Sequence, residues 1–188
     1  MKNNSINIGL FGSSFNPPHL GHFAVIKDLI RQKIFYEIWL IPVYAHPFDK
    51  KLLNFEDRLI LLNLFLRDLN EASVKITTVE RDLNNKPSYT YDTIVKLREH
   101  LPHAHFTLIL GSDTKNDINL DKWYRYDDLK KIAGFYFVPR KGFEDSPYPD
   151  VSSSQIRGHL AKNESIDHLT TKSVADYLAR HHLYRAGF

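Results

Sequence analysis

The chain has 188 residues, of which 43% are hydrophobic and 25% are charged, and its formal net charge is +3. This length and composition are typical of one globular domain with a sizeable core, and so modest a charge argues against a nucleic-acid-binding protein, which carries clustered basic stripes. The chain has no cysteine, which excludes disulfides and thiolate metal sites.

Short apolar runs alternate with amphipathic runs along the chain. The runs rich in β-branched and aromatic residues predict strands at 6–11, 36–43, 74–79, 106–110 and 134–138. The runs with helical spacing predict helices at 20–33, 55–68, 89–100, 126–131, 152–160 and 171–181. Strands that alternate with helices indicate parallel βαβ units. The expected fold class is therefore α/β: a single Rossmann-like open parallel sheet of about five or six strands, with helices on both faces and C-terminal helices, in one domain over 1–188.

Polar segments follow four of the predicted strands, at 12–22, 44–51, 111–125 and 139–142. Ligands of open α/β sheets bind beyond the carboxyl ends of the strands. These four segments are therefore expected to meet around one site.

The first of them reads GSSFNPPHLGH, from Gly12 to His22. It contains neither GK[ST] nor GxGxxG, so it is neither of the two common phosphate loops. Its small residues expose backbone N–H groups, and His19 and His22 share one face of the first helical turn, where they suit an anion. The simpler alternative is a surface HxxH in a proline-rich loop. A zinc site is weaker still, because spacing places no third ligand.

The same segment resembles the opening HxGH motif of the nucleotidyltransferase superfamily, and within it the bacterial nicotinate (nicotinamide) mononucleotide adenylyltransferases. Further segments carry the resemblance in the same order along nearly the whole chain. They are PSYTYDT at 87–93, LGSD at 110–113, KWYRY at 122–126, PRKG at 139–142 and VSSSQIR at 151–157. Together these motifs are highly specific, whereas HxGH alone marks only the superfamily.

The resemblance implies an enzyme of NAD biosynthesis that joins ATP and nicotinate mononucleotide to give nicotinate adenine dinucleotide and pyrophosphate. The attacking phosphate is already ionised, so the reaction needs no general base. The protein must instead position two anions and absorb the charge of the transition state. Mg²⁺ would be carried by the ATP phosphates, with few or no ligands from the protein.

The resemblance also implies roles for individual residues on the ATP side. The catalytic residues would be His19, His22 and Arg157. The ATP-binding set would be Gly12, Ser13, Ser14, His19, His22, Gly111, Asp113, Arg140, Ser152, Ser153, Ser154 and Arg157. Asp113 would accept hydrogen bonds from the adenosine ribose. The alternative, that it caps the helix after its strand, is compatible with this role. Ordinary helix capping is likewise the alternative for the three serines.

For the mononucleotide the implied residues are Asn16, His46, Lys50, Thr90, Trp123 and Tyr124. Trp123 would stack on the cationic pyridinium ring, unless it is a core residue. Backbone N–H groups at Thr90 and Tyr124 would meet the nicotinate carboxylate.

One segment departs from the family's pattern. The family has a PPHK-like loop for the mononucleotide phosphate, whereas this chain reads VYAHPFDKK at 43–51. His46 and Lys50, or Lys51 in place of Lys50, are the candidates for the phosphate contact. Arg58, on the following helix, either supports this loop or is a solvated helix charge.

Three alternatives keep part of this interpretation. Nicotinamide mononucleotide is the first alternative acceptor, and phosphopantetheine or another phosphate monoester is a more distant one. A non-catalytic nucleotide-binding regulator would be expected to lose His22 or Arg157, and both are present.

The expected partners are ATP and a pyridine mononucleotide, without nucleic acid or membrane, and a homo-oligomer is left open. The N-terminus lacks the pattern of a signal peptide, and the longest apolar runs are too short to cross a bilayer. The expected location is therefore the cytoplasm.

Overall fold

The computed structural model describes residues 6–45, 51–84, 87–116, 123–140 and 145–185. The strands within these residues are β1 (Asn7–Ser13), β2 (Glu37–Pro42), β3 (Val74–Ile76), β4 (His105–Gly111) and β5 (Gly134–Val138). The helices are α1 (Leu20–Arg31), α2 (Phe55–Leu69), α3 (Val79–Leu83), α4 (Thr90–His100), α5 (Ser112–Asn116), α6 (Tyr126–Ile132), α7 (Ser153–Ala161) and α8 (Lys172–Arg180).

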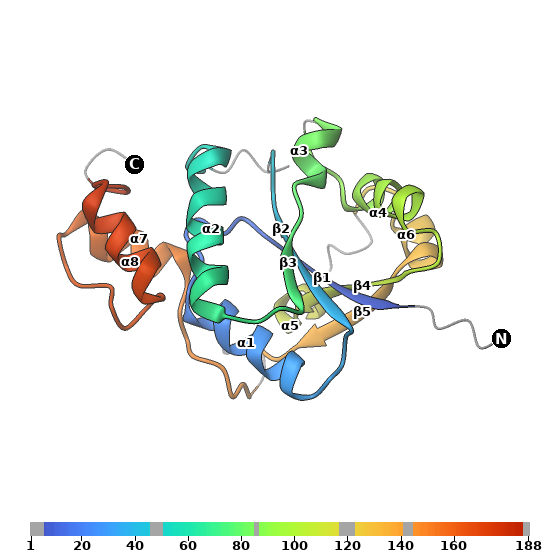
Figure 1. Cartoon of the computed structure of the whole chain (residues 1–188), viewed down its shortest axis with the longest axis horizontal. Coiled ribbons are helices and arrows are strands. Elements are labelled where there is room, and N and C mark those ends of the chain that lie inside the picture. The colour runs from blue at the N-terminus through green and yellow to red at the C-terminus, as the bar shows by residue number, and fades with distance from the viewer. Residues whose placement is uncertain (1–5, 46–50, 85–86, 117–122, 141–144, 186–188) are drawn as a thin grey trace.

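The strands form one parallel sheet in the order β3-β2-β1-β4-β5 (Figure 1). The chain builds the sheet from β1 outwards through β2 and β3, then returns to the other side of β1 with β4. The strand order therefore reverses between β1 and β4. In open α/β sheets this reversal opens a crevice at the carboxyl ends of the two strands, where ligands bind.

Helices cover both faces of the sheet, as the alternation of elements predicts (Figure 1). Because successive side chains of a strand point to opposite faces, β1 contributes to two cores. Ile8 and Leu10 pack with Ile94 and Leu97 of α4, whereas Phe11 packs in the core that includes α1, α2 and α8. This confirms the predicted α/β class with a Rossmann-like parallel sheet.

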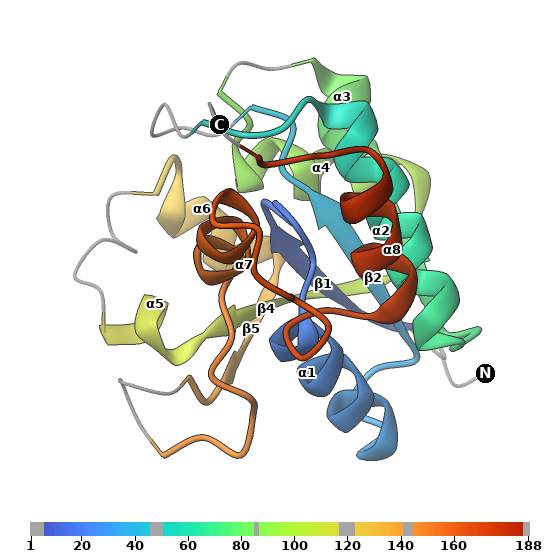
Figure 2. The same ribbon diagram turned by 90° about the vertical axis from the view of Figure 1, so that its left-hand side faces the viewer.

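The C-terminal helices α7 and α8 lie on the same side of the molecule as α2 (Figures 1 and 2). The segment between them is bonded to the start of α1. The Leu20 N–H donates to the Leu169 carbonyl (3.0 Å), and the Thr170 hydroxyl donates to the Pro18 carbonyl (2.8 Å). The end of the chain therefore supports the beginning of its first helix.

The predicted strand at 74–79 is wrong over its last three residues. The β3 strand ends at Ile76, and α3 begins at Val79. Val79 packs with Ile94 and Leu97, and the neighbouring Glu80 accepts the Tyr44 N–H. These long-range contacts override the local preference of two threonines and a valine for strand.

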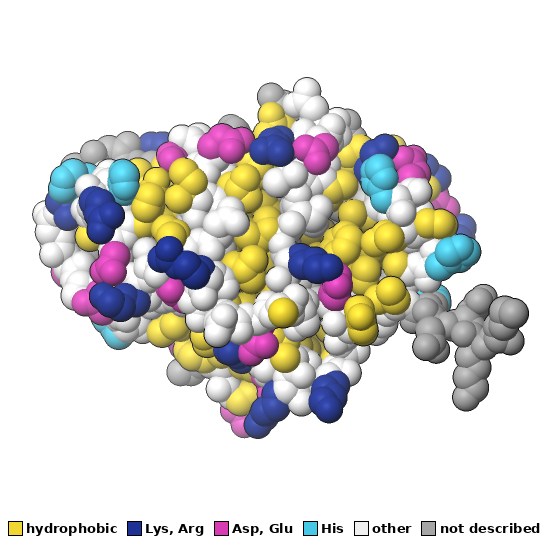
Figure 3. Space-filling view, viewed as in Figure 1, with side chains coloured by type: hydrophobic (Ala, Val, Ile, Leu, Met, Phe, Trp, Pro, Cys, Tyr) yellow, Lys and Arg dark blue, Asp and Glu magenta, His cyan; other side chains and the backbone are white. Residues whose placement is uncertain are grey.

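None of the helices in the described part of the chain is long and apolar enough to span a membrane. On the face shown in Figure 3, the coloured Lys and Arg side chains alternate with Asp and Glu. This face therefore carries mixed charge and shows no basic stripe among its described residues.

Candidate active site

Two cavities open at the carboxyl ends of the strands. The first has a volume of about 400 Å³ and the second about 420 Å³. Gly12 of β1 and Leu110 of β4 line both of them. The cavities therefore meet at the two strands where the strand order reverses, as expected for a ligand site in this fold.

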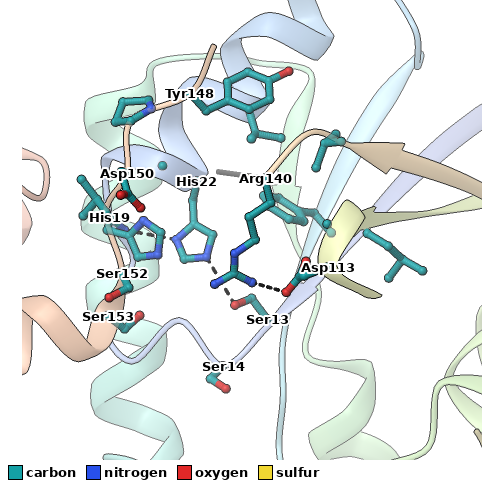
Figure 4. Close-up of a pocket in the computed structure, with 18 of the residues that line it drawn as sticks. Ser13, Ser14, His19, His22, Asp113, Arg140, Tyr148, Asp150, Ser152 and Ser153 are labelled. Atoms are coloured by element: carbon teal, nitrogen blue, oxygen red, sulfur yellow. Dashed lines mark hydrogen bonds and ion pairs between the residues drawn. The ribbon is translucent and has the colours of Figure 1, made fainter. Parts of the chain in front are cut away.

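His19 and His22 lie side by side at the start of α1, on the wall of the first cavity (Figure 4). Their rings are stacked, with centroids 3.7 Å apart. The His19 backbone N–H donates to His22 Nδ1 (3.2 Å), so the His22 ring caps the helix. Because Nδ1 accepts this bond, a neutral His22 carries its proton on Nε2. That nitrogen, 3.3 Å from Ser13 Oγ, is thereby fixed as a donor.

Burial lowers the pKa of both imidazoles. The pKa of His19 falls to about 4, first through burial and then through the positive charge of Arg140. The pKa of His22 lies well below its ordinary value because of burial, His19 and Arg140, in that order. Both rings are therefore neutral at pH 7, and the positive charge around this cavity comes from arginines.

We expect the protein to lose stability as the pH falls from 7 to 5. The unfolded chain protonates His19 near pH 6.5, whereas the folded chain keeps it neutral down to about pH 4. The unfolded state binds more protons between these values, so stability falls with pH, by on the order of 2 kcal/mol at pH 5. Urea unfolding at both pH values measures this loss. His19→Gln cannot titrate and should remove the part of the loss that His19 contributes, leaving the part that the buried His22 contributes. An unchanged pH dependence in that variant would contradict the prediction.

Arg140 and Asp113 form an ion pair across the first cavity from the histidines (Figure 4). Asp113 Oδ1 is buried and has no hydrogen-bond partner within the described structure. A Cβ at residue 111 would collide with this oxygen, so the close approach requires Gly111. Asp113 lies inside α5, which begins at Ser112, so it is not the cap of that helix. The ion pair with Arg140 therefore leaves Asp113 Oδ1 without a hydrogen bond.

The three serines at the start of α7 have different partners. Ser152 is the N-cap and accepts the Gln155 N–H (3.1 Å), so the capping alternative is correct for this serine. The Ser153 hydroxyl donates to the Pro17 carbonyl (2.8 Å), and the Ser154 hydroxyl accepts from Arg157 (3.0 Å). All three line the first cavity.

Arg157 also lines the first cavity and links α7 to the loop after β1. One guanidinium nitrogen donates to the Asn16 carbonyl (2.8 Å) and another to the Ser154 hydroxyl. Its charge is therefore held at the wall of the first cavity.

Gly12, Ser13 and Ser14 form the floor of the first cavity. A Cβ on Gly12 would meet no atom within 4 Å, so the glycine leaves open space between the two cavities. The predicted ATP-side residues thus gather around one cavity, from β1, α1, β4, α5, the residues after β5, and α7.

The second cavity is mostly apolar and aromatic. Its wall contains the predicted Thr90, Trp123 and Tyr124, together with Tyr89. The Tyr89 and Tyr124 rings are stacked, with centroids 4.5 Å apart, and Tyr124 is 47% exposed. Trp123 is partly buried against the core below it, so its core and binding interpretations both retain a basis.

Glu80 lines the second cavity and was not singled out from the sequence. It is buried, and it accepts the Tyr44 N–H (3.0 Å). Burial raises the pKa of Glu80, while hydrogen bonds from Tyr44 and Ser88 act in the opposite direction. The sequence next to Glu80 does not predict its burial, because its partners Tyr44 and Ser88 follow β2 and precede α4.

Arg58 is only 1% exposed, so the solvated alternative is wrong. Its guanidinium donates to three backbone carbonyls, at Leu53 (3.0 Å), Ser14 (2.8 Å) and Val43 (2.7 Å). It therefore supports the ends of both β1 and β2.

One of the predicted mononucleotide residues lies elsewhere. Asn16 is fully buried and lines the first cavity, not the second. His46 and Lys50 lie outside the described residues. The described part of the chain holds no group of three or more His, Cys, Asp or Glu side chains able to bind a metal ion.

This arrangement matches known proteins in sequence and in fold. The family model described as cytidylyltransferase-like matches residues 10–159. Nicotinate-nucleotide adenylyltransferase of Bacillus subtilis is 30% identical over 191 aligned positions, which cover 95% of this chain and 98% of that protein.

Two solved structures share the fold of this chain. A provisionally assigned nicotinate-nucleotide adenylyltransferase from Vibrio parahaemolyticus has a TM-score of 0.78 and 28% identity, covering 96% of both chains. Nicotinic acid mononucleotide adenylyltransferase of Plasmodium falciparum, solved in complex with NaAD, has a TM-score of 0.79. It is 23% identical over 95% of this chain and 97% of that chain, and supports the fold alone.

Proposed function

Since the chain belongs to the cytidylyltransferase-like family and, within it, to the nicotinate-nucleotide adenylyltransferases, we propose that its two cavities bind the two substrates of that reaction. The enzyme joins ATP and nicotinate mononucleotide to give nicotinate adenine dinucleotide and pyrophosphate, in NAD biosynthesis. The observation that carries the assignment of substrates to cavities is the meeting of a polar cavity and an aromatic cavity at Gly12.

The first cavity suits ATP. The triphosphate needs cations and N–H donors, which Arg140, Arg157 and the two histidines would supply. The unpartnered oxygen of Asp113 would accept a ribose hydroxyl. Mg²⁺ would enter on the ATP phosphates, whose oxygens are the ligands that it prefers.

The second cavity suits the pyridine nucleotide. Its aromatic wall offers Trp123 as a stacking face for a cationic ring. Thr90 is the first residue of α4, so its N–H has no partner in the helix and lies at the positive end of the helix dipole. This group would receive the nicotinate carboxylate.

Catalysis follows from this placement. The 5′-phosphate oxygen of the mononucleotide attacks the α-phosphorus of ATP, the bond from that phosphorus to the β-phosphate bridging oxygen breaks, and pyrophosphate leaves. Charge grows on the α-phosphate oxygens and on the leaving group. His22 Nε2–H and Arg157, which are already in position, would stabilise this charge.

The cysteine-free composition agrees with a cytoplasmic enzyme.

Pyrophosphate release tests the proposed substrates. Purified protein with ATP and Mg²⁺ is given nicotinate mononucleotide, nicotinamide mononucleotide or phosphopantetheine in parallel. We expect release with nicotinate mononucleotide and a much lower rate with the other two. Preference for the amide would assign the second cavity to the alternative acceptor, and no release with any acceptor would refute the assignment.

A further inference from the structure

The loop after β1, which lines the first cavity, has a strained backbone. Residues 13–16, named here the phosphate loop, connect β1 to the prolines before α1. Phe15 within it is fully buried and has a positive φ of 44°. A bulky residue adopts this backbone conformation only where its surroundings hold it.

Three buried or partly buried side chains hold this loop from below. Arg58 of α2 donates to the Ser14 carbonyl, and Arg157 of α7 donates to the Asn16 carbonyl, each at 2.8 Å. The third is Tyr184, whose hydroxyl donates to Asn16 Oδ1 at 2.6 Å. The loop is therefore fixed by segments from the middle and the end of the chain.

Tyr184 lies beyond α8 and is 4% exposed. Burial raises the pKa of its phenol, so the hydroxyl keeps its proton and remains a donor. The same Asn16 oxygen accepts the Leu53 N–H (3.0 Å). The side-chain oxygen of Asn16 is thus held by two donors, and its backbone carbonyl accepts a hydrogen bond from Arg157.

We infer that Tyr184 is a positioning residue for ATP: its hydroxyl fixes Asn16, and Asn16 fixes the phosphate loop and the guanidinium of Arg157. The inference rests on the proposed function, because it takes the first cavity as the ATP site. Tyr184 lines neither cavity, whereas Asn16, which accepts its hydroxyl, lines the first.

Tyr184→Phe removes the hydroxyl and keeps the buried ring. Titration calorimetry with Mg²⁺ and ATP measures the affinity directly, without any acceptor. We expect ATP to bind roughly fivefold to tenfold more weakly, the effect of one lost buried hydrogen bond. The KM for nicotinate mononucleotide should change by less than about twofold, since the second cavity is untouched.

Tyr177→Phe is the matched control. Tyr177 lies on α8, packs partly buried against the same core and stacks on His181, and its hydroxyl bonds to no described residue. This variant should bind ATP as the parent does. A purely structural role for Tyr184 would lower the melting temperature and leave the ATP affinity of the folded protein unchanged, which would overturn the inference.

A double-mutant cycle tests the route. If the Tyr184 hydroxyl acts through the Asn16 side chain, Tyr184→Phe should weaken ATP binding by less than about twofold when Asn16→Ala is already present. An undiminished effect in that background would overturn the proposed route. Because the parent's pyrophosphate release is measured separately, failure of this inference and failure of the proposed function give different results.

Discussion

Replacing His22 by alanine should lower turnover by roughly 10²–10³, the loss observed when one donor to a developing oxyanion is removed. The neutral imidazole presents Nε2–H to the first cavity because Nδ1 is occupied by the His19 backbone N–H. Steady-state pyrophosphate release with saturating ATP and nicotinate mononucleotide measures the effect. The loss should appear in kcat, since the donor acts mainly on charge that develops in the transition state.

His22→Gln separates the two roles of this side chain. A glutamine amide can place an N–H near the position of Nε2 but does not reproduce the ring that caps α1. We therefore expect it to recover part of the turnover while both variants lose similar stability, about 1 kcal/mol for a lost cap. Turnover of the alanine variant within about twofold of the parent would show that His22 is structural only.

Replacing Trp123 by alanine should weaken nicotinate mononucleotide binding and leave ATP binding nearly unchanged. Loss of an aromatic stacking face costs roughly 1–3 kcal/mol, which is about fivefold to a hundredfold in affinity. Titration calorimetry with each ligand measures both. An equal loss for both ligands would mean that Trp123 acts as a core residue.

The chain offers a direct probe of this contact, because it has only two tryptophans. Trp39 lies on β2, packs against Phe106 and lines neither cavity. Trp39→Phe therefore leaves Trp123 as the single indole fluorophore and should bind the mononucleotide normally. The fluorescence of Trp123 in this variant should be quenched when nicotinate mononucleotide is added. Unchanged emission at saturation would contradict stacking.

Much of the fold could be predicted because its signals are local. The run of β1 and the amphipathic spacing of α1 and α2 follow from neighbouring residues, and the structure agrees with them to within a few residues. The strand expected at 74–79 ends early, at Ile76, and a helix begins at Val79. A distant contact stabilises this helix, because Glu80 accepts the Tyr44 N–H. Local preference carries no information about that partner.

The candidate site divides in the same way. His19 and His22 are three residues apart on one helix, so the sequence alone places their rings together and predicts an anion clamp. The chain order of its motifs likewise determined the family and the position of the site beyond the strands.

Only the tertiary structure decided which buried groups hold the phosphate loop that precedes these histidines. Arg58 bonds Ser14 across 44 positions, and Tyr184 bonds Asn16 across 168. The tertiary structure also lowers the pKa of both histidines, because it buries them near Arg140. Burial and charge depend on every segment packed around a group, whereas a motif records only the residues beside it in the chain.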